Sequence, residues 1–343
     1  MNKEEIWQHA KRYGYLDFRD VFILPQYSEI EARASVDTSI RVGNLNLSVP
    51  VFSSNMDTVS GSELCRAMFA GGGIGALHRF MTIESNVAEY RSVVDHAGEC
   101  FVSVGVNEDS KERSRALYEA GARYFVIDIA HGHSLMMRKM TEWLRSTYPG
   151  IYIVSGNVAT PEGVRDLVEW GADACKEGCG PGSQCLTKNV TGITCPPFSA
   201  ALNCSKAVDD YELKTHKGER PLIIADGGMS EYGDIAKAIG AGADLVMIGG
   251  MFAGCKEAPG ERIGDKKIFR GMASKSAMLT IRSADRLPTA EGMVSLIDAT
   301  DISATTVLEE MRGGLRSSLS YSNSRTIKEY HSNVEFGVRL NKI

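Results

Sequence analysis

The sequence has no hydrophobic run long enough to cross a membrane. Its longest apolar stretches, such as residues 245–254, are about half of the roughly 20 residues that a transmembrane helix needs. The first residues, MNKEEIWQHAKR, are charged and lack the apolar core of a signal peptide. From these absences we expect a cytoplasmic protein that has no membrane partner.

An excess of positive charge is also missing. The chain has 38 lysines and arginines against 43 aspartates and glutamates, and its formal net charge is -5. A negative surface repels phosphates, so we expect no nucleic-acid partner. The 8 cysteines are sparse for a disulfide-rich secreted domain, and their spacing does not provide four zinc ligands. We therefore expect reduced thiols.

Short runs of apolar and β-branched residues are what the sequence does contain. Segments with helical spacing of apolar residues separate these runs, and several of them close on glycine. Eight such βα units predict an α/β fold, a (β/α)₈ TIM barrel with its active site at the carboxyl ends of the strands. The alternative, an open doubly wound sheet, would have a G-x-G-x-x-G after the first strand, which is absent. The expected strands lie within residues 50–55, 72–78, 100–106, 124–130, 151–158, 173–178, 221–228 and 244–250.

The pattern predicts one barrel domain over residues 1–343. An N-terminal lead-in occupies residues 1–45, and a C-terminal flap and tail region occupies residues 255–343. Between them, residues 179–197 form a loop rich in glycine, proline, threonine and cysteine. A loop of this length is functional or disordered, so we take it as the catalytic loop.

Polar side chains follow several of the expected strands. Each of them is equally suited to capping the next helix, but their occurrence after so many strands predicts a shared site. They include Asn55, Asp57, His78, Arg79, Asp128, His131, Asn157 and Asp226.

Glycine pairs follow the last two expected strands, as Asp226-Gly227-Gly228 and Gly249-Gly250. Without a Cβ atom, such residues let backbone N–H groups approach an anion, so we expect a phosphate there, with plain turn glycines as the alternative. Asp226 is suited to accept hydrogen bonds from a ribose diol.

The segment GCGPGSQCLTK, residues 178–188, is the most informative part of the long loop. Its glycines and proline impose a backbone path that directs carbonyl groups to one point, as a monovalent cation site needs. Ser183 is placed to donate to a phosphate. Cys185 is a candidate nucleophile, with a buried inert cysteine as the alternative.

Over essentially its whole length the sequence resembles the IMP dehydrogenase and GMP reductase family. The resemblance lies in LDFRDV, SSNMDTV, GGIGALHR, IDIAHGHS, KEGCGPGSQCLTK, IADGG, MIGG and FRGMASKSAM. It implies that Cys185 attacks C2 of a purine nucleotide and that the covalent adduct exchanges hydride with a nicotinamide. It also implies that Thr187 and Glu291 relay a proton to departing ammonia.

Within the family, the resemblance is to the reductase branch, which converts GMP and NADPH to IMP and ammonia. Dehydrogenases typically carry an Arg-Tyr pair on a long mobile flap, whereas only 12 residues, LTIRSADRLPTA, separate Met278 from Glu291. Inserted regulatory domains are absent, and Phe269 stands where dehydrogenases have a phosphate-binding tyrosine. The alternatives are an IMP dehydrogenase without regulatory domains, a reductase of a modified purine nucleotide, and a nucleotide-binding barrel without catalysis.

The resemblance also implies the remaining site residues and a homotetramer in which Arg33 reaches a neighbour's dinucleotide. The purine nucleotide would be held by Arg79, Ser183, Asp226, Gly227, Gly228, Gly249, Gly250, Gly271, Met272, Ala273, Ser274 and Gly292. The cofactor NADPH would be held by Arg33, Asp128, Ile129, Ala130, Asn157 and Gly180. A potassium ion would be held by backbone carbonyls of Gly180, Gly182, Cys185 and Lys188.

Four residues depart from the family pattern. Glu177 replaces an apolar residue, Leu186 a threonine, Lys188 an arginine, and Pro288 an arginine near the nucleotide. From these departures we expect a base pocket that differs from the family's, in which Glu177 would be an extra carboxylate able to select another purine.

Overall fold

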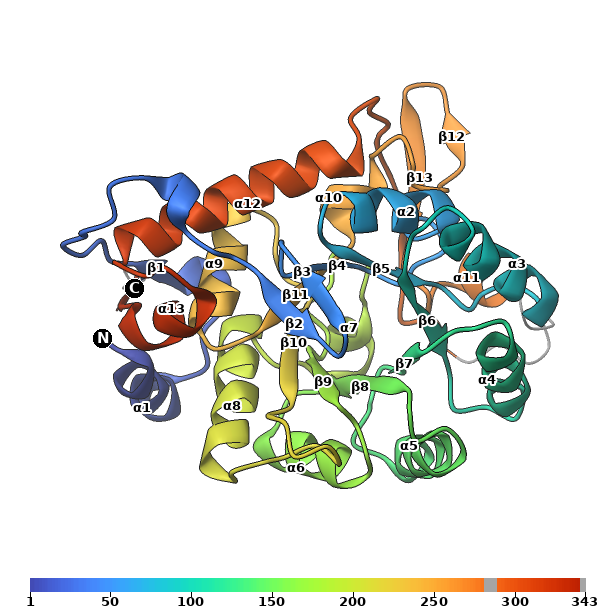
Figure 1. The fold of residues 1–343 in the computed structure, drawn as a ribbon, viewed down its shortest axis with the longest axis horizontal. Helices are drawn as coiled ribbons and strands as arrows, with labels where there is room; N and C mark the ends of the chain where they lie inside the picture. The colour runs from blue at the N-terminus through green and yellow to red at the C-terminus, as the bar shows by residue number, and fades with distance from the viewer. Residues whose placement is uncertain (281–288, 340–343) are drawn as a thin grey trace.

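A computed structural model of the chain describes residues 1–280 and 289–339. Eight parallel strands close into a barrel at its centre, and the order around the barrel is β10-β11-β4-β5-β6-β7-β8-β9 (Figure 1). The expected TIM barrel is therefore confirmed, and each expected run contains one strand. The strands are β4 (Val51–Ser53), β5 (Ile74–Leu77), β6 (Cys100–Val104), β7 (Tyr124–Asp128), β8 (Tyr152–Val158), β9 (Ala174–Glu177), β10 (Leu222–Asp226) and β11 (Leu245–Ile248).

The barrel strands are apolar on both faces because each face is covered. Side chains that point inward, among them Phe52, Phe101 and Met247, form one buried cluster inside the barrel. Those that point outward pack against helices in a second, larger cluster. This two-sided burial is why the strands read as continuous apolar runs in the sequence.

Helices surround the barrel. Threonine or serine caps begin α3, α5 and α6, and Gly121, Gly171 and Gly242, all with positive φ, follow the ends of α4, α6 and α9. The surrounding helices are α2 (Ser62–Ala70), α3 (Ile83–Val94), α4 (Asp109–Glu119), α5 (Leu135–Thr147), α6 (Pro161–Glu169), α8 (Pro197–Asp210), α9 (Tyr232–Gly240), α10 (Gly250–Ala253) and α12 (Ala304–Tyr321). Helix α12 packs on α9 and α2 (Figure 1).

The N-terminal residues lie on the outside and at the amino end of the barrel. Helix α1 (Lys3–Tyr13) packs against α8, and β1 (Val21–Ile23) pairs with β15 (Phe336–Val338) near the C-terminal helix α13 (Ile327–Asn333). The short helices η1 (Phe18–Asp20) and η2 (Arg33–Ser35) connect these elements. The hairpin β2 (Ile40–Val42) and β3 (Leu45–Leu47) adds Val42 and Leu47 to the inner cluster, so it closes one end of the barrel.

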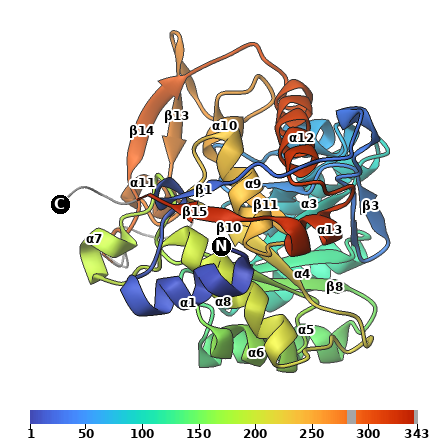
Figure 2. The same cartoon turned by 90° about the vertical axis from the view of Figure 1, so that its left-hand side faces the viewer.

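The opposite end carries the loop 179–197 and the part of the C-terminal region before α12. A separate sheet of β12 (Arg262–Ile263), β13 (Lys266–Arg270) and β14 (Val294–Asp298) rises there. Figure 2 shows this sheet, α7 (Thr187–Thr191) and α11 (Lys275–Met278) on one side of the molecule and β3 on the other. In the described ranges, no helix has both the length and the apolar character of a membrane span.

Candidate active site

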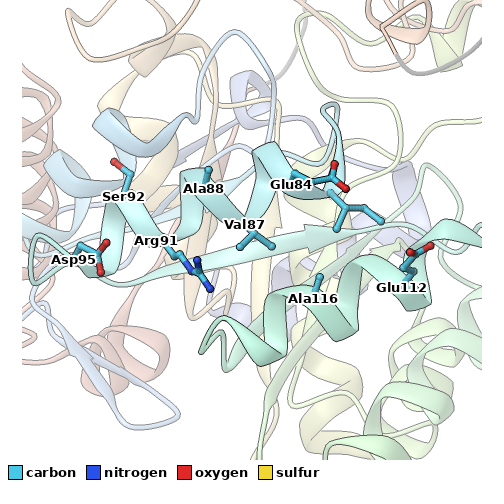
Figure 3. A pocket seen from close by; sticks show the side chains of 9 residues that line it. Glu84, Val87, Ala88, Arg91, Ser92, Asp95, Glu112 and Ala116 are labelled. Atoms are coloured by element: carbon cyan, nitrogen blue, oxygen red, sulfur yellow. The ribbon is translucent and has the colours of Figure 1, made fainter.

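One groove on the outer surface lies away from the expected site residues. It measures about 770 Å³ and runs between α3 and α4 (Figure 3). Ile83, Val87 and Ala116 line it together with Glu84 and Glu112, and none of these follows a barrel strand directly. The expected site residues lie instead at the carboxyl ends of the strands, and Cys185 lies in the loop that follows β9.

Cys185 begins a chain of hydrogen bonds that ends on a carboxylate. Its Sγ donates to Thr187 Oγ1 over 3.3 Å, and Thr187 Oγ1 donates to Glu291 Oε2 over 2.7 Å. Thr187 is buried, whereas Cys185 and Glu291 are half-buried, so the two ends of the chain are open to a ligand. A proton can pass from the thiol to the carboxylate through the hydroxyl, because a hydroxyl both accepts and donates.

Backbone pairing aligns these side chains. Leu186 N donates to Glu291 O over 2.6 Å, Met293 N donates to Gln184 O over 3.0 Å, and Cys185 forms an antiparallel bridge with Gly292. Ser295 Oγ adds a bond to the Gln184 side chain over 3.2 Å. The catalytic loop and the segment before β14 thus form one short ladder, although they are far apart in the sequence.

The segment expected to hold the purine, Gly271–Ser274, packs against this ladder. Gly271 N donates to Met293 O, and Glu291 N donates to Ala273 O. A Cβ atom on Gly292 would lie 2.6 Å from Ser274 N, and one on Gly271 would lie 2.6 Å from Gln184 O. Both positions therefore need glycine, and the structure brings all the expected base-binding residues beside Cys185.

The two glycine pairs lie next to each other, because β10 and β11 are neighbours in the barrel. Gly227 and Gly228 have φ of +89° and +80°, and a Cβ on Gly227 would lie 3.1 Å from Gly182 N. The turn that precedes the exposed Ser183 therefore rests on this glycine pair, while Gly249 and the exposed Gly250 follow β11. The expected phosphate residues are brought to one part of the rim.

A lysine that sequence reasoning missed holds the centre of the site. Lys176 Nζ lies 2.8 Å from Asp128 Oδ1 and 2.5 Å from Asp226 Oδ2, and it donates to Asn157 Oδ1. Asn55 Nδ2 donates to Asp128 Oδ2 over 3.0 Å. The expected cofactor residues Asp128 and Asn157 and the expected ribose residue Asp226 thus share one cation.

The charges in this network stabilise one another. Burial by itself lowers the pKa of Lys176, but the two carboxylates outweigh it and the pKa is raised. Burial likewise raises the pKa of Asp128, but Lys176 and the bond from Asn55 outweigh it and the pKa is lowered. Lys176 and Asp128 therefore both stay charged at neutral pH. The alternation of side chains along a strand could have identified Lys176. Cys175 points outward to Val164 of α6, so the next residue, Lys176, points inward.

Glu177, by the same alternation, points away from the mouth of the barrel. It is 1% exposed, and its Oε2 has no hydrogen-bond partner among the described residues. Its carboxyl lies close enough to Cys204 of α8 and to Cys195 to affect the pKa of both thiols. Burial, followed by the negative charge of Asp226, raises its pKa well above the usual carboxyl range. Glu177 is buried at the end of β9, which argues against a contact with the purine, and the prediction that it selects the purine is left to the substitution test below.

The loop carbonyls expected to hold potassium are partly engaged. Gly182 O accepts from Cys185 N and Lys188 O accepts from Gly192 N, whereas the Gly180 and Cys185 carbonyls accept no bond from described residues. Gly180 has φ of +81°, which glycine tolerates best. Within the described ranges no cluster of histidine, cysteine and acidic side chains would hold a metal ion, so any cation here depends on these carbonyls.

The remaining expected residues are spread more widely. Ile129 and the exposed Ala130 follow β7, where Ile129 N donates to Gly156 O. Arg79 follows β5, with its guanidinium 5.0 Å from the Phe80 ring. Arg33 is held on α12 by Ser317 and Tyr321, so within one chain it is not joined to the Cys185 cluster. Pro288, one of the expected departures, lies outside the described residues.

Comparison with known proteins agrees with this geometry. Residues 15–342 match the sequence profile described as IMP dehydrogenase / GMP reductase domain. A GMP reductase of Streptococcus gordonii is 35% identical over 340 residues, which cover 96% of this chain and 97% of that protein. An inosine-5'-monophosphate dehydrogenase of Aquifex aeolicus is 39% identical over 245 residues, 68% of this chain and 48% of that protein. The structure of a Trypanosoma brucei GMP reductase variant in complex with guanosine 5'-monophosphate superposes with a TM-score of 0.86 at 28% identity and covers 97% of both chains.

Proposed function

This chain belongs to the IMP dehydrogenase / GMP reductase family of oxidoreductases, and from that premise we propose that it converts GMP to IMP and ammonia with NADPH. The observation that carries the proposal is the hydrogen-bonded chain from Cys185 through Thr187 to Glu291. It supplies a nucleophile and a proton carrier at one place, and loss of an amino group requires both. The GMP reductases of Streptococcus gordonii and Trypanosoma brucei support the same reaction by similarity.

The first half of the reaction removes ammonia. Cys185 gives its proton to Glu291 through Thr187, and the thiolate attacks C2 of GMP. The electron pair displaced from the C2–N3 double bond returns and expels the 2-amino group, which takes the proton back along the same path and leaves as ammonia. The product is a thioimidate in which Cys185 stays bonded to C2. A positioned acid of this kind contributes about 10²–10⁴-fold to the rate.

The second half restores the thiol. NADPH held beside Asp128, Ala130 and Asn157 would supply a hydride for C2. The bond between C2 and the sulfur of Cys185 would then break, and the sulfur would take up a proton. In total, GMP, NADPH and one proton give IMP, NADP⁺ and ammonia. For this half the protein has to hold C2 still and keep water away from the adduct. The ladder between the catalytic loop and Gly292 serves both purposes in the proposal.

The residues present fit the two bound molecules. The nucleotide would lie with its phosphate on the glycine pairs, its ribose on Asp226 and its base on Gly271–Ser274. The nicotinamide would lie beside Asp128, Ala130 and Asn157, where Ala130 is exposed after the end of β7. In the same proposal potassium would be bound by the loop carbonyls, among which those of Gly180 and Cys185 are open to it.

Four copies of the chain are part of the proposal. Arg33 is exposed on the outer layer, where it would contact a neighbour's dinucleotide rather than its own chain's. The free face of the β12–β14 sheet exposes apolar area, with Ile263 51% and Leu296 57% exposed. Light scattering on the purified protein should give four times the mass of one chain, and the mass of a single chain would contradict this part.

IMP dehydrogenase is the second candidate, because the Aquifex aeolicus dehydrogenase shares 39% identity over 68% of this chain. In that reaction hydride leaves IMP first, and water then releases XMP from the thioimidate. An activating Arg-Tyr pair has no counterpart in the 12 residues between Met278 and Glu291. This difference favours the reductase.

A substrate panel separates the candidates. GMP, deoxy-GMP, IMP and XMP are each mixed with NADPH or NAD⁺ in potassium buffer, and the absorbance of reduced nicotinamide is followed. The reductase proposal predicts loss of NADPH with GMP and formation of IMP. Reduction of NAD⁺ with IMP would establish the dehydrogenase instead. Binding of nucleotides without turnover in any mixture would indicate a barrel that does not catalyse.

A further inference from the structure

Two charged residues without a role so far form an ion pair beside the expected purine site. Arg270 Nε lies 3.2 Å from Asp57 Oδ1 and 3.0 Å from Asp57 Oδ2, and Nη2 of the same arginine also binds Oδ2. The side chains are 21% and 8% exposed. Two parallel contacts from a planar guanidinium fix orientation as well as distance, which a single lysine contact does not.

The pair is the strongest of several links between two segments. Asp57 and Thr58 follow barrel strand β4, and Arg270 ends β13 immediately before the purine segment Gly271–Ser274. Arg270 N donates to Thr58 Oγ1 over 3.3 Å, and Asp57 N lies 3.2 Å from Met272 Sδ. The start of the purine segment is therefore fastened to the barrel itself.

The other side of the purine segment is hydrogen-bonded to the ladder that holds Cys185. Its bonds there run to Glu291 and Met293, the same residues that pair with the catalytic loop. Without the link to Asp57, the purine segment would follow any shift of that ladder. With it, the position of the base is set from the barrel, and the position of Cys185 is set from the loop.

We propose that Asp57 and Arg270 are positioning residues for the nucleotide base. Their ion pair holds Gly271–Ser274 at the place from which C2 of the purine meets Cys185 Sγ. The identity of the purine rests on the proposed function, whereas the positioning role rests on the contacts alone. Neither side chain needs to touch the ligand for this role.

The test compares Arg270→Gln, Arg270→Lys and Asp57→Asn with the unchanged protein. Dissociation constants are measured by calorimetry for the purine monophosphate that the unchanged protein binds most tightly, and kcat and KM are measured for both substrates. We expect Arg270→Gln and Asp57→Asn to weaken nucleotide binding at least tenfold while the KM for NADPH changes less than threefold. Arg270→Lys should fall between, because it keeps the charge and loses the second contact. The double variant Asp57→Asn/Arg270→Gln should have a nucleotide dissociation constant no higher than that of the single variant with the lower affinity. The reason is that the two residues act as one unit.

Arg220→Gln is the matched control. It removes an arginine that binds both oxygens of Asp244 over 3.2 and 3.1 Å at the opposite end of the barrel, where Asp244 is also 8% exposed. The control should lose stability and keep its nucleotide affinity. The proposal is overturned if Arg270→Gln binds within twofold of the unchanged protein, or if Arg220→Gln loses as much affinity. If Arg270→Gln does not fold, Arg270→Lys and Asp57→Asn decide by the same criterion.

This design keeps the two proposals apart. If the unchanged protein binds GMP without consuming NADPH, the proposed reductase activity fails while the binding measurements still test the ion pair. If GMP is reduced and the variants bind normally, the positioning role fails and the activity stands.

Discussion

At the scale of single residues, Thr187 decides how Cys185 and Glu291 work together. Its hydroxyl accepts from the thiol and donates to the carboxylate, so it can move a proton in either direction between them. A valine has the same shape but neither capacity. The reaction proposed here needs the path twice, once to form the thiolate and once to protonate the leaving amine.

Thr187→Val and Glu291→Gln should therefore lower kcat by about 10²–10⁴-fold. Nucleotide affinity should change little, because neither substitution removes a contact of the phosphate or ribose. Stopped-flow NADPH oxidation and calorimetry measure the two quantities. Thr191→Val, in the same short helix, is the control and should keep its kcat. A Thr187→Val variant with ordinary kcat would show that the proton takes another route.

His78 should make stability depend on pH. Burial lowers the pKa of this histidine to about 4, from a value near 6.5 in the unfolded chain. Between about pH 4 and pH 6.5 the imidazole of His78 is protonated in the unfolded state and neutral in the folded state. The free energy of unfolding therefore rises with pH through this window and falls as pH drops from about 6.5 toward 4. Across the whole window, the free energy of unfolding should change by about 3 kcal/mol because of His78. Urea unfolding at a series of pH values measures it, and His78→Gln should remove most of this slope; an unchanged slope would mean that His78 is not its source.

Glu177 should be replaceable without loss of specificity. Burial raises the pKa of its carboxyl, so the folded state holds a proton that the unfolded state releases as pH rises. Stability contributed by this group is thus present at low pH and lost toward neutral pH. Glu177→Gln removes that loss, so we expect a higher free energy of unfolding at pH 7.5 and the same preference among purine nucleotides. A changed preference would return Glu177 to the base pocket.

At the scale of elements, the ladder between the catalytic loop and the segment before β14 is the feature that assembles the site. Gly292 lies in this ladder with no room for a side chain. Gly292→Ala should push the purine segment away from Cys185 and lower kcat/KM for GMP at least tenfold, while circular dichroism stays that of the native fold. Gly313→Ala, in α12, meets nothing within 4 Å and should stabilise the helix without changing activity. Full activity of Gly292→Ala would mean that the ladder does not position the purine.

The elements differ in how far the sequence alone predicts them. The barrel strands were predictable because burial on both faces leaves an unbroken apolar run, as in Tyr124–Asp128. The sequence predicts that Lys176 and Glu177 belong to one such strand, but it does not distinguish their surroundings. Lys176 points into the barrel and pairs with two carboxylates, whereas the Glu177 side chain points to the other face and is buried. The contact of Leu186 with Glu291 was not predictable from local pattern, because it depends on how distant segments meet.

At the scale of the whole molecule, the barrel explains why residues from many parts of the chain share one site. Parallel strands all end at the same rim, so Asn55, Asp128, Asn157, Lys176 and Asp226 meet there although they come from five strand ends. The family resemblance predicted most of these positions, and the structure brings them together at one rim. It did not predict what binds them together, because Lys176 carries no motif of its own.

The central claim is that Cys185 bonds to the purine, and mass spectrometry tests it most directly. The protein is incubated with GMP alone, quenched in acid during the ammonia-releasing half of the reaction, digested and weighed. We expect the peptide containing Cys185 to gain the mass of GMP less ammonia, and the corresponding peptide of Cys185→Ser to gain none. A Cys185 peptide that stays unmodified in a preparation that reduces GMP once NADPH is added, or an adduct on Cys179 or Cys195 instead, would contradict it.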